Sequence, residues 1–429
     1  MRRWQWILLR TARQLWFRAT LIGALGVAAA GLALLADRFI PGQQQLDVGA
    51  DAVNSVLSII ASSMLAVTTF SLSVMTSAYG AAASTVTPRA TPLLRQDRVT
   101  QNVLSTFLGS FLFSIVGIVA LKAGAYGPQG RAVLFVVTIG VIVLVVVALL
   151  SWIDHLTRLG NVRETTDRVE EATRSALAAR LACPFLGGIP RDETATPPPG
   201  AVTVRAQVTG YVQHVDMGAL DACGARLETP ICLAVVPGAF VHEGTPLMVL
   251  PHAGAATAEA LEETDQKGMA QTLRDAITIG DARSFDQDPR FGLSVLSEIA
   301  SRALSPAVND PGTAIDVIGR AARLLTLWAK GHAEDAAEPP CPHVQVPPLL
   351  AADLFDDAFR PIARDGAALI EVQLRLRKTL LALAGMGDDA FRAAARATAD
   401  LALAHAEAAL RIEADKRLLR GGAPVGGGR

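Results

Sequence analysis

"AVNSVLSIIASSMLAVTTFSLSVMTSAYGAAASTVTP", Ala52 to Pro88, decides the fold, because this long stretch contains no charged residue. It holds roughly 37 residues and would measure about 55 Å as one helix, nearly twice the ~30 Å hydrocarbon core of a bilayer. We therefore expect a membrane helix that continues into the cytoplasm and couples the membrane part to the rest of the chain. The overall composition, 51% hydrophobic and 18% charged, is also more apolar than that of an average soluble protein.

Three further charge-free stretches are long enough to cross a bilayer, which takes about 20 apolar residues. They are Ala19 to Ala36, Val99 to Leu121 and Ala132 to Ile153. Residues 1–153 are accordingly predicted to form a four-helix transmembrane domain. The absence of any acidic or basic residue from all four stretches argues against a proton-coupled pump, which needs an ionisable relay in the membrane.

The arginines near the ends of these stretches predict the orientation, because cytoplasmic loops are enriched in positive charge. Five precede the first stretch, and Arg89, Arg95 and Arg98 lie between the second and the third. This distribution predicts a multi-pass protein of the inner (plasma) membrane with both termini in the cytoplasm. We expect Arg89, Arg95 and Arg98 to anchor the chain at the lipid headgroups of the bilayer. A ring of charge that attracts anions to a cytoplasmic vestibule is the alternative role.

The second stretch has an unusual density of hydroxyl and amide side chains for a membrane helix. At 100° per residue the polar ones fall within about a 100° sector: Asn54, Ser58, Ser62, Thr69, Ser73 and Thr76. A polar stripe that faces lipid is unfavourable, so it should face other helices or water. One interpretation is close helix–helix packing. The other is a pore lined by the stripe in an oligomer, with Leu65 as an apolar constriction.

The remainder of the chain is polar enough to be cytoplasmic. Residues 154–190 are predicted to be a helical connector, 201–252 a small β-barrel or sandwich, 255–415 a helical domain and 416–429 a disordered tail. The β segment "PGAFVHEGTPL" resembles a hairpin of the lipoyl and biotinyl carriers. Those carriers need a lysine for attachment, and no lysine lies between Lys122 and Lys267, which excludes covalent carriage here.

Two Asp-Pro pairs mark the starts of helices in the predicted helical domain. An Asp before Pro suits a helix N-terminus, because its carboxylate accepts a free backbone N–H while Pro lacks one. Asp288-Pro289 and Asp310-Pro311 therefore predict a helix, a corner around Asn309, and a second helix that packs back on the first. The alternative is a cation or anion site that uses Asp286 with Asp288, Asn309 and Asp310, which would require their oxygens to converge.

The corner segment "RALSPAVNDPGTA" resembles a signature of the predicted bacterial membrane proteins catalogued as domain of unknown function 2254. "TTFSLSVMTSAYGAAASTVTPRATPLLRQD", "GYVQHVDMGAL" and "PGAFVHEGTPL" resemble further segments of that family in the same order. The resemblance extends over nearly the whole chain to about residue 330, and "VTPRATP" departs from its usual Ser-Pro-Arg form. It implies the architecture of the family and no activity.

Several function classes lack support in the sequence. A net charge of −1 gives no basic field for nucleic acid. The four scattered cysteines and the isolated His214, His242 and His252 show no metal-binding spacing, and no nucleotide or hydrolase motif occurs. We expect neither an enzyme nor a cofactor or metal. The leading hypothesis is a homo-oligomeric channel whose cytoplasmic domains assemble and gate it. The alternative is a non-conducting membrane-anchored scaffold or stress sensor that binds an unknown protein partner.

Overall fold

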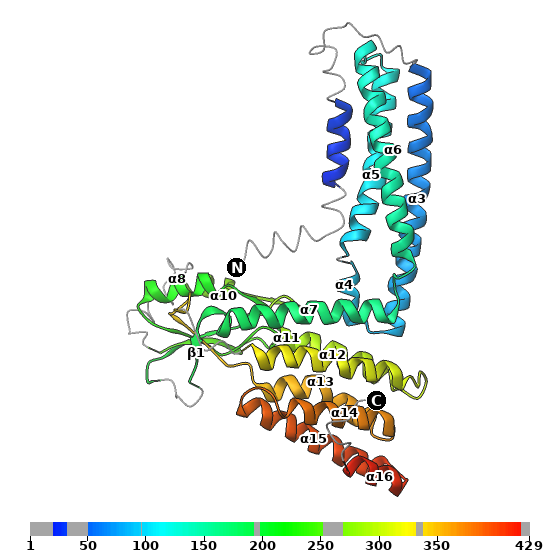
Figure 1. Cartoon of the computed structure of the whole chain (residues 1–429). Helices are drawn as coiled ribbons and strands as arrows, with labels where there is room; N and C mark the ends of the chain where they lie inside the picture. Colours follow the sequence, from blue (N-terminus) through cyan, green and yellow to red (C-terminus); the bar gives the residue numbers. More distant parts are fainter. Residues whose placement is uncertain are drawn as a thin grey trace. The chain divides into compact units, whose positions relative to one another are not determined.

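The computed structural model describes residues 20–31, 50–95, 97–192, 198–251, 269–331 and 338–421. The described chain divides into two compact units, a membrane unit that ends at Thr165 and a second unit that begins at Thr166. The first contains the long apolar helices, and the second contains both sheets and the other long helices (Figure 1). The division falls within helix α7 (Val162–Ala182), beyond the predicted limit at residue 153.

Among the described residues of the membrane unit, three helices are long and apolar enough to cross a membrane. They are α3 (Ala50–Thr85), α5 (Arg98–Lys122) and α6 (Pro128–Leu156). They lie side by side, and the short helices η1 (Pro88–Ala90) and α4 (Thr91–Arg95) connect α3 to α5 (Figure 1). The predicted second stretch is therefore one continuous helix of 36 residues.

The first of the four predicted spans, Ala19 to Ala36, is not confirmed. Its described part is the helix Thr20–Gly31, which is too short to cross a bilayer on its own. Residues 1–19 and 32–49, which include its flanks, lie outside the described residues. Thr20–Gly31 approaches α5 closely, since a Cβ added at Gly109 would lie 2.7 Å from Cγ2 of Ile22.

Burial differs strongly among the three long helices. α5 is the most buried within the unit and α6 the least. α6 exposes large apolar side chains such as Val136, Val143 and Leu150 over much of its length. A surface of this kind is stable in lipid and unfavourable in water, which agrees with a membrane location for these helices.

Two small open sheets form the β part of the second unit. The five-stranded sheet has the order β1-β8-β4-β6-β2, with parallel pairs β1–β8 and β8–β4 and antiparallel pairs β4–β6 and β6–β2. The antiparallel three-stranded sheet has the order β5-β3-β7. The strands are β1 (Ile189–Pro190), β2 (Val202–Arg205), β3 (Gly210–Val215), β4 (Ile231–Leu233), β5 (Phe240–Val241), β6 (Pro246–Leu250), β7 (Ile277–Gly280) and β8 (Val344–Val346). One hydrophobic core is shared by the two sheets with α8 (Met217–Leu227) and α10 (Met269–Asp275).

The predicted barrel or sandwich is not confirmed, because both sheets are open. They also take strands from outside the predicted β segment, residues 201–252, namely β1, β7 and β8. β8 has only three residues and lies between two prolines, so it is too short to show the alternation of a half-buried strand. The predicted connector, residues 154–190, contains the end of α6, all of α7, η2 (Pro184–Gly187) and β1.

The predicted helical domain is an array of six described helices that begins after β7 (Figure 1). They are α11 (Pro289–Ala303), α12 (Pro311–Lys330), α13 (Ala351–Asp365), α14 (Ile370–Leu383), α15 (Asp389–Ala409) and α16 (Glu413–Arg420). α16 is helical to Arg420, so the prediction of a disordered tail from residue 416 is wrong for residues 416–420. Residues 422–429 lie outside the described residues.

Candidate functional site

Helix α3 has one face that packs within the membrane unit and one that does not. Val53, Leu57, Ile60 and Met64 on the first face are buried in two hydrophobic clusters shared with α5 and α6. The other face is exposed over the full length of the helix. The packed face is almost entirely apolar, but the exposed face also carries large apolar side chains such as Phe70, so burial of apolar surface alone does not decide which face packs.

The predicted polar stripe lies on the exposed side of α3. Asn54 is half-buried, and the six others are exposed: Ser58, Ser62, Leu65, Thr69, Ser73 and Thr76. Leu65, the predicted constriction, is 52% exposed. Within one chain, the stripe is therefore not used to pack α3 against α5 or α6.

Hydroxyl groups of the stripe form hydrogen bonds within α3 itself. Oγ of Ser62 donates to the carbonyl oxygen of Ser58 (3.0 Å), and Oγ1 of Thr69 donates to that of Leu65 (2.9 Å). Thr76 donates to the carbonyl oxygen of Leu72 in the same way (2.9 Å). These hydroxyls need no water to be satisfied, so the stripe is compatible with lipid and with a partner helix as well as with a pore.

Asn54 differs from the hydroxyl residues of the stripe. Its side-chain Oδ1 is buried and accepts no hydrogen bond from any described residue. A buried amide oxygen without a donor costs free energy. Asn54 is therefore the position of the stripe with the greatest need for a partner.

Small side chains form a regular seam along the exposed face of α3. The seam residues follow one another at alternating steps of four and three, as in a heptad pattern. They are Ser55, Ile59, Ser62, Ala66, Thr69, Ser73, Thr76 and Gly80, all of them exposed. Seven of the eight are small, and small residues four apart allow two membrane helices to approach closely. We call this set the α3 seam.

The three predicted headgroup arginines flank a well-packed connection. Val86, Ala90 and Leu94 are completely buried, while Arg89, Arg95 and Arg98 are exposed. Nε2 of Gln101 donates to the carbonyl oxygen of Arg95 (3.0 Å), which ties the connection to α5. The structure thus presents three exposed cationic side chains between η1 and the start of α5.

A buried polar cluster that the sequence did not predict joins α5 to the end of α6. Asp97 caps α5, and its Oδ2 accepts hydrogen bonds from N (2.9 Å) and Oγ1 (2.5 Å) of Thr100. The same Oδ2 lies 2.8 Å from Nε2 of His155, which is also buried. A single acidic residue such as Asp97 next to a long apolar run is only a weak signal of a buried polar cluster. Its partner His155 lies 58 positions away, and no local sequence pattern links the two.

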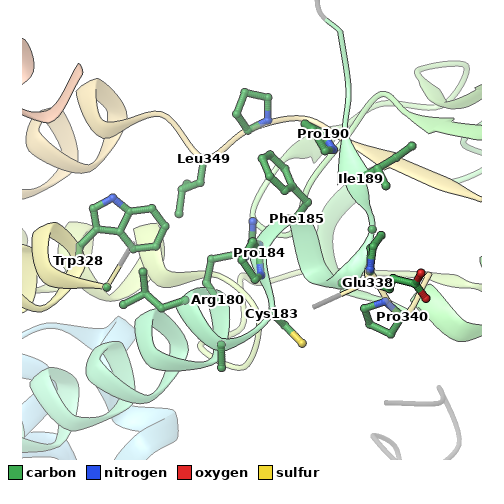
Figure 2. A pocket seen from close by; sticks show the side chains of 17 residues that line it. Arg180, Cys183, Pro184, Phe185, Ile189, Pro190, Trp328, Glu338, Pro340 and Leu349 are labelled. Atoms are coloured by element: carbon green, nitrogen blue, oxygen red, sulfur yellow. The ribbon is translucent and has the colours of Figure 1, made fainter. Parts of the chain in front are cut away.

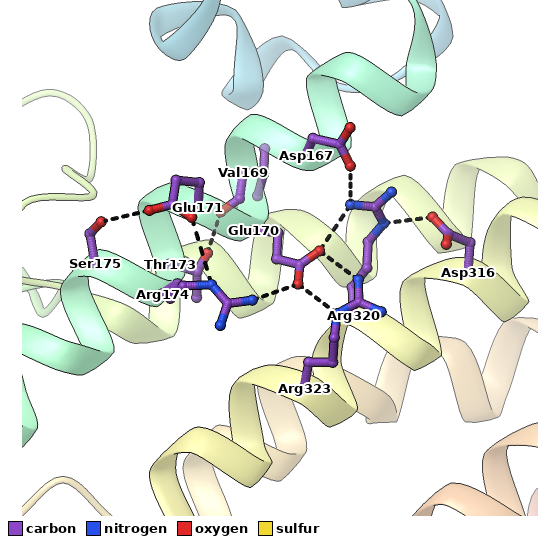
Figure 3. A network of polar contacts seen from close by, with 10 residues as sticks. All are labelled: Asp167, Val169, Glu170, Glu171, Thr173, Arg174, Ser175, Asp316, Arg320 and Arg323. Atoms are coloured by element: carbon purple, nitrogen blue, oxygen red, sulfur yellow. Dashed lines mark hydrogen bonds and ion pairs between the residues drawn. The ribbon is translucent and has the colours of Figure 1, made fainter. Parts of the chain in front are cut away.

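A second unpredicted network joins α7 to α12 within the second unit (Figure 3). Nη1 of Arg320 lies 2.9 Å from Oε2 of Glu170 and 2.5 Å from Oδ1 of Asp167. Nε of Arg320 lies 2.6 Å from Oδ2 of Asp316. Nη2 of Arg323 also lies 2.8 Å from Oε2 of Glu170. Burial alone would raise the pKa of Glu170, but the hydrogen bonds and charges of Arg323 and Arg320 outweigh it and lower this pKa. The network fixes the register of the two helices.

The aspartates of the two Asp-Pro pairs cap the N-termini of helices. Asp288 caps α11 by accepting from N of Phe291 (3.1 Å), and Asp310 caps α12 by accepting from N of Thr313 (3.0 Å). α12 packs on α11, and Asn309 adopts a left-handed backbone conformation (φ 49°) at the turn between them. This is a helix–corner–helix arrangement.

The alternative cation site at these corners finds little support. Both carboxylate oxygens of Asp288 bind Arg283, at 2.8 and 3.1 Å, whereas Asp310 is exposed. The hydrogen bonds to Thr313 lower the pKa of Asp310. Within the described ranges, no group of three or more His, Cys, Asp or Glu side chains could hold a metal ion.

Three long apolar helices and a second unit of helices and small sheets indicate a membrane protein of two units. The chain belongs to the family described as predicted membrane protein (DUF2254), whose family model matches residues 12–382. This confirms the resemblance noted in the sequence. The family description adds membrane location and no activity.

Mycobacterial proteins are among the relatives of the chain. "Uncharacterized protein Rv1290c" of Mycobacterium tuberculosis and "Uncharacterized protein Mb1321c" of Mycobacterium bovis are each 30% identical to it over 234 residues. The matched region is 52% of this chain and 42% of each relative, so the chain spans less than half of their length. No solved structure matches the chain.

Proposed function

We propose that this protein is a homo-oligomeric channel of the inner membrane in which the α3 helices of several subunits surround the conduction path. The observation that carries the proposal is the α3 seam, a regular line of small and hydroxyl side chains that stay exposed in the described part of the subunit. Such a line favours close contact with identical helices. Both termini are placed in the cytoplasm in this proposal, because the arginines cluster on that side.

The chemistry of α3 suits a path for small ions or polar solutes. No charged side chain lies between Ala52 and Pro88, so no fixed charge would trap a permeating ion. Leu65 lies near the middle of the apolar run and would supply a dewetting constriction. In this arrangement the exposed Arg89, Arg95 and Arg98 would favour anions at the entrance. The second unit would assemble the subunits and gate the path.

Flux through liposomes tests the proposal. Purified protein should pass ions, and Ser62→Trp should reduce the flux strongly, because an indole on the seam would block the path or separate the helices. Ser63→Trp is the matched control: Ser63 is exposed, adjacent and off the seam, so this variant should keep most of the flux. Equal flux in the two variants would contradict a path along the seam.

The second candidate is a membrane-anchored scaffold or sensor without conduction, which binds a protein partner through the second unit. The hydrogen bonds of Ser62, Thr69 and Thr76 within α3 favour it, because they remove the need for water along the stripe. Liposomes that stay tight at every voltage and membrane tension would support this candidate over the channel. Neither candidate includes a catalytic activity.

A further inference from the structure

The second unit contains a cavity of about 860 Å³ beside the end of α7 (Figure 2). Its walls come from the end of α7, from η2 and β1, from the end of α12 and from the segment that precedes α13. Most of the lining is apolar, with Pro184, Phe185, Trp328 and Leu349 among the residues around it. The volume lies within the range of small-molecule sites in proteins.

One buried cation lines this otherwise apolar cavity. Arg180 is only 7% exposed, and its hydrogen bond from Nη2 to the carbonyl oxygen of Gln287 is long at 3.4 Å. In the described part of the chain, no carboxylate forms an ion pair with it. The nearby Asp288 is already bound on both oxygens by Arg283. Burial lowers the pKa of Arg180 to about 10, although the charge of Asp288 acts in the opposite direction.

A buried guanidinium without a carboxylate partner is unfavourable unless an anion accompanies it. The carbonyl end of α7 offsets only part of the charge, because a helix dipole is equivalent to about half a unit charge. The one acidic residue of the lining, Glu338, is exposed and is not paired with Arg180. Among the described residues, the cavity therefore lacks the anion that its arginine requires.

The wall next to Arg180 is held in an unusual backbone conformation. Phe185 and Leu186 both lie in the left-handed region, at φ 53° and 59°, which bulky residues rarely adopt. The hydrogen bond from N of Cys341 to the carbonyl oxygen of Gly187 (2.9 Å) and the pairing of β1 with β8 stabilise this turn. Backbone strain of this kind concentrates at ligand sites, where it shapes a preformed wall.

We propose that this cavity binds an anionic amphiphile, a molecule with one carboxylate or phosphate group on an apolar body. Arg180 pairs with the anionic group, because its planar fork matches carboxylate and phosphate oxygens. The apolar body fills the space lined by Phe185, Trp328 and Leu349. This site goes beyond the proposed channel and does not depend on it, because all of its residues belong to the second unit.

Equilibrium dialysis on the full chain in lipid nanodiscs, against empty nanodiscs, tests the site with three probes. Octanoate and octyl phosphate should bind, while uncharged octanol should bind at least about tenfold more weakly, the least that a charge-assisted hydrogen bond contributes. Tighter binding of either anion identifies the preferred group. Equal binding of octanol and octanoate would overturn the proposal, as would no binding of either anion.

Variants separate a ligand role for Arg180 from a structural one. Arg180→Met should weaken octanoate binding by roughly 10- to 100-fold, and Arg180→Lys should keep part of it. Arg163→Met, at an exposed arginine of the same helix, is the matched control and should bind normally. Because no described residue forms an ion pair with Arg180, Arg180→Met should also leave the melting temperature of the ligand-free protein unchanged or raised. A large drop in melting temperature together with unchanged octanoate binding would assign Arg180 a structural role instead.

Discussion

The polar side chains of α3 and those of α7 are satisfied in different ways. On α3, hydroxyls donate to carbonyl oxygens of the same helix, as Thr69 does to Leu65. On α7, Glu170 is satisfied by two arginines of α12. A hydroxyl that bonds within its own helix leaves the choice of neighbour open, whereas a buried charge requires one particular neighbour. The difference explains why the α7 network identifies its partner helix while the α3 seam does not.

The largest expected loss of stability comes from adding a side chain where α11 approaches α7 closely. A Cβ added at Gly292 of α11 would lie 1.8 Å from Oγ1 of Thr173 on α7, so Gly292→Val should force the two helices apart. We expect a loss of about 3 kcal/mol in the free energy of unfolding, the upper end for overpacking. Denaturant unfolding of the detergent-solubilised protein measures it.

Gly80→Val on the α3 seam is the matched control. A Cβ at Gly80 would meet no atom within 4 Å, so this variant should leave the unfolding of a single chain nearly unchanged. If the seam forms subunit contacts, the same variant should shift the oligomer toward smaller species in mass photometry. Comparable destabilisation by both substitutions would contradict the assignment of the two faces.

Loss of the buried charge on α7 should have the next largest effect. Glu170→Gln leaves Arg320, itself 5% exposed, with only Asp167 and Asp316, whose side chains are about half exposed. We expect destabilisation by about 2 kcal/mol, less than the ~3–5 kcal/mol for breaking a buried pair completely, because Arg320 keeps these two partners. Glu171→Gln provides the control, because Glu171 is 71% exposed and should contribute less than about 0.5 kcal/mol.

The pH dependence of the unfolding free energy, compared between the wild type and Glu170→Gln, sharpens this prediction. The pKa of Glu170 is lower in the folded protein than its ordinary value of 4.5. Its stabilisation is therefore complete above about pH 4.5 and is lost as the pH falls through the lower folded value. The difference in unfolding free energy between the wild type and Glu170→Gln should be constant near neutral pH and shrink in acid. A difference that stays constant into strong acid would show that ionisation of Glu170 is not the cause.

The smallest effect is expected on the α3 stripe. Thr69→Val keeps the side-chain shape and removes a hydroxyl whose acceptor, the carbonyl oxygen of Leu65, already belongs to the same helix. The free energy of unfolding should change by less than about 0.5 kcal/mol. A loss above about 1 kcal/mol would show that Thr69 contacts another helix in the folded protein, and a change in flux without a change in stability would support the proposed path.

Composition sufficed to predict the long apolar helices, because a charge-free run of this length has few stable alternatives to a membrane. It could not show which face of α3 packs, since that depends on the shape of α5. The pair Glu170–Arg174 has a spacing of four that is visible in the sequence, but Arg320 is 150 residues from Glu170 and no local pattern links them. The open sheets were missed because β1 and β8 have only two or three residues each and, like β7, lie outside the predicted β segment.

The length of α3 bears on how the protein tolerates bilayers of unequal thickness. A helix of 36 residues measures about 54 Å, so a ~30 Å hydrocarbon layer can enclose only part of it. Ser55, Ser62, Thr69 and Thr76 recur every seven residues, two turns of helix, along the same line. A shift of α3 by two turns along the bilayer normal would therefore bring an equivalent set of side chains to the same depth. The helix would then offer the same kind of contact surface to a neighbouring helix.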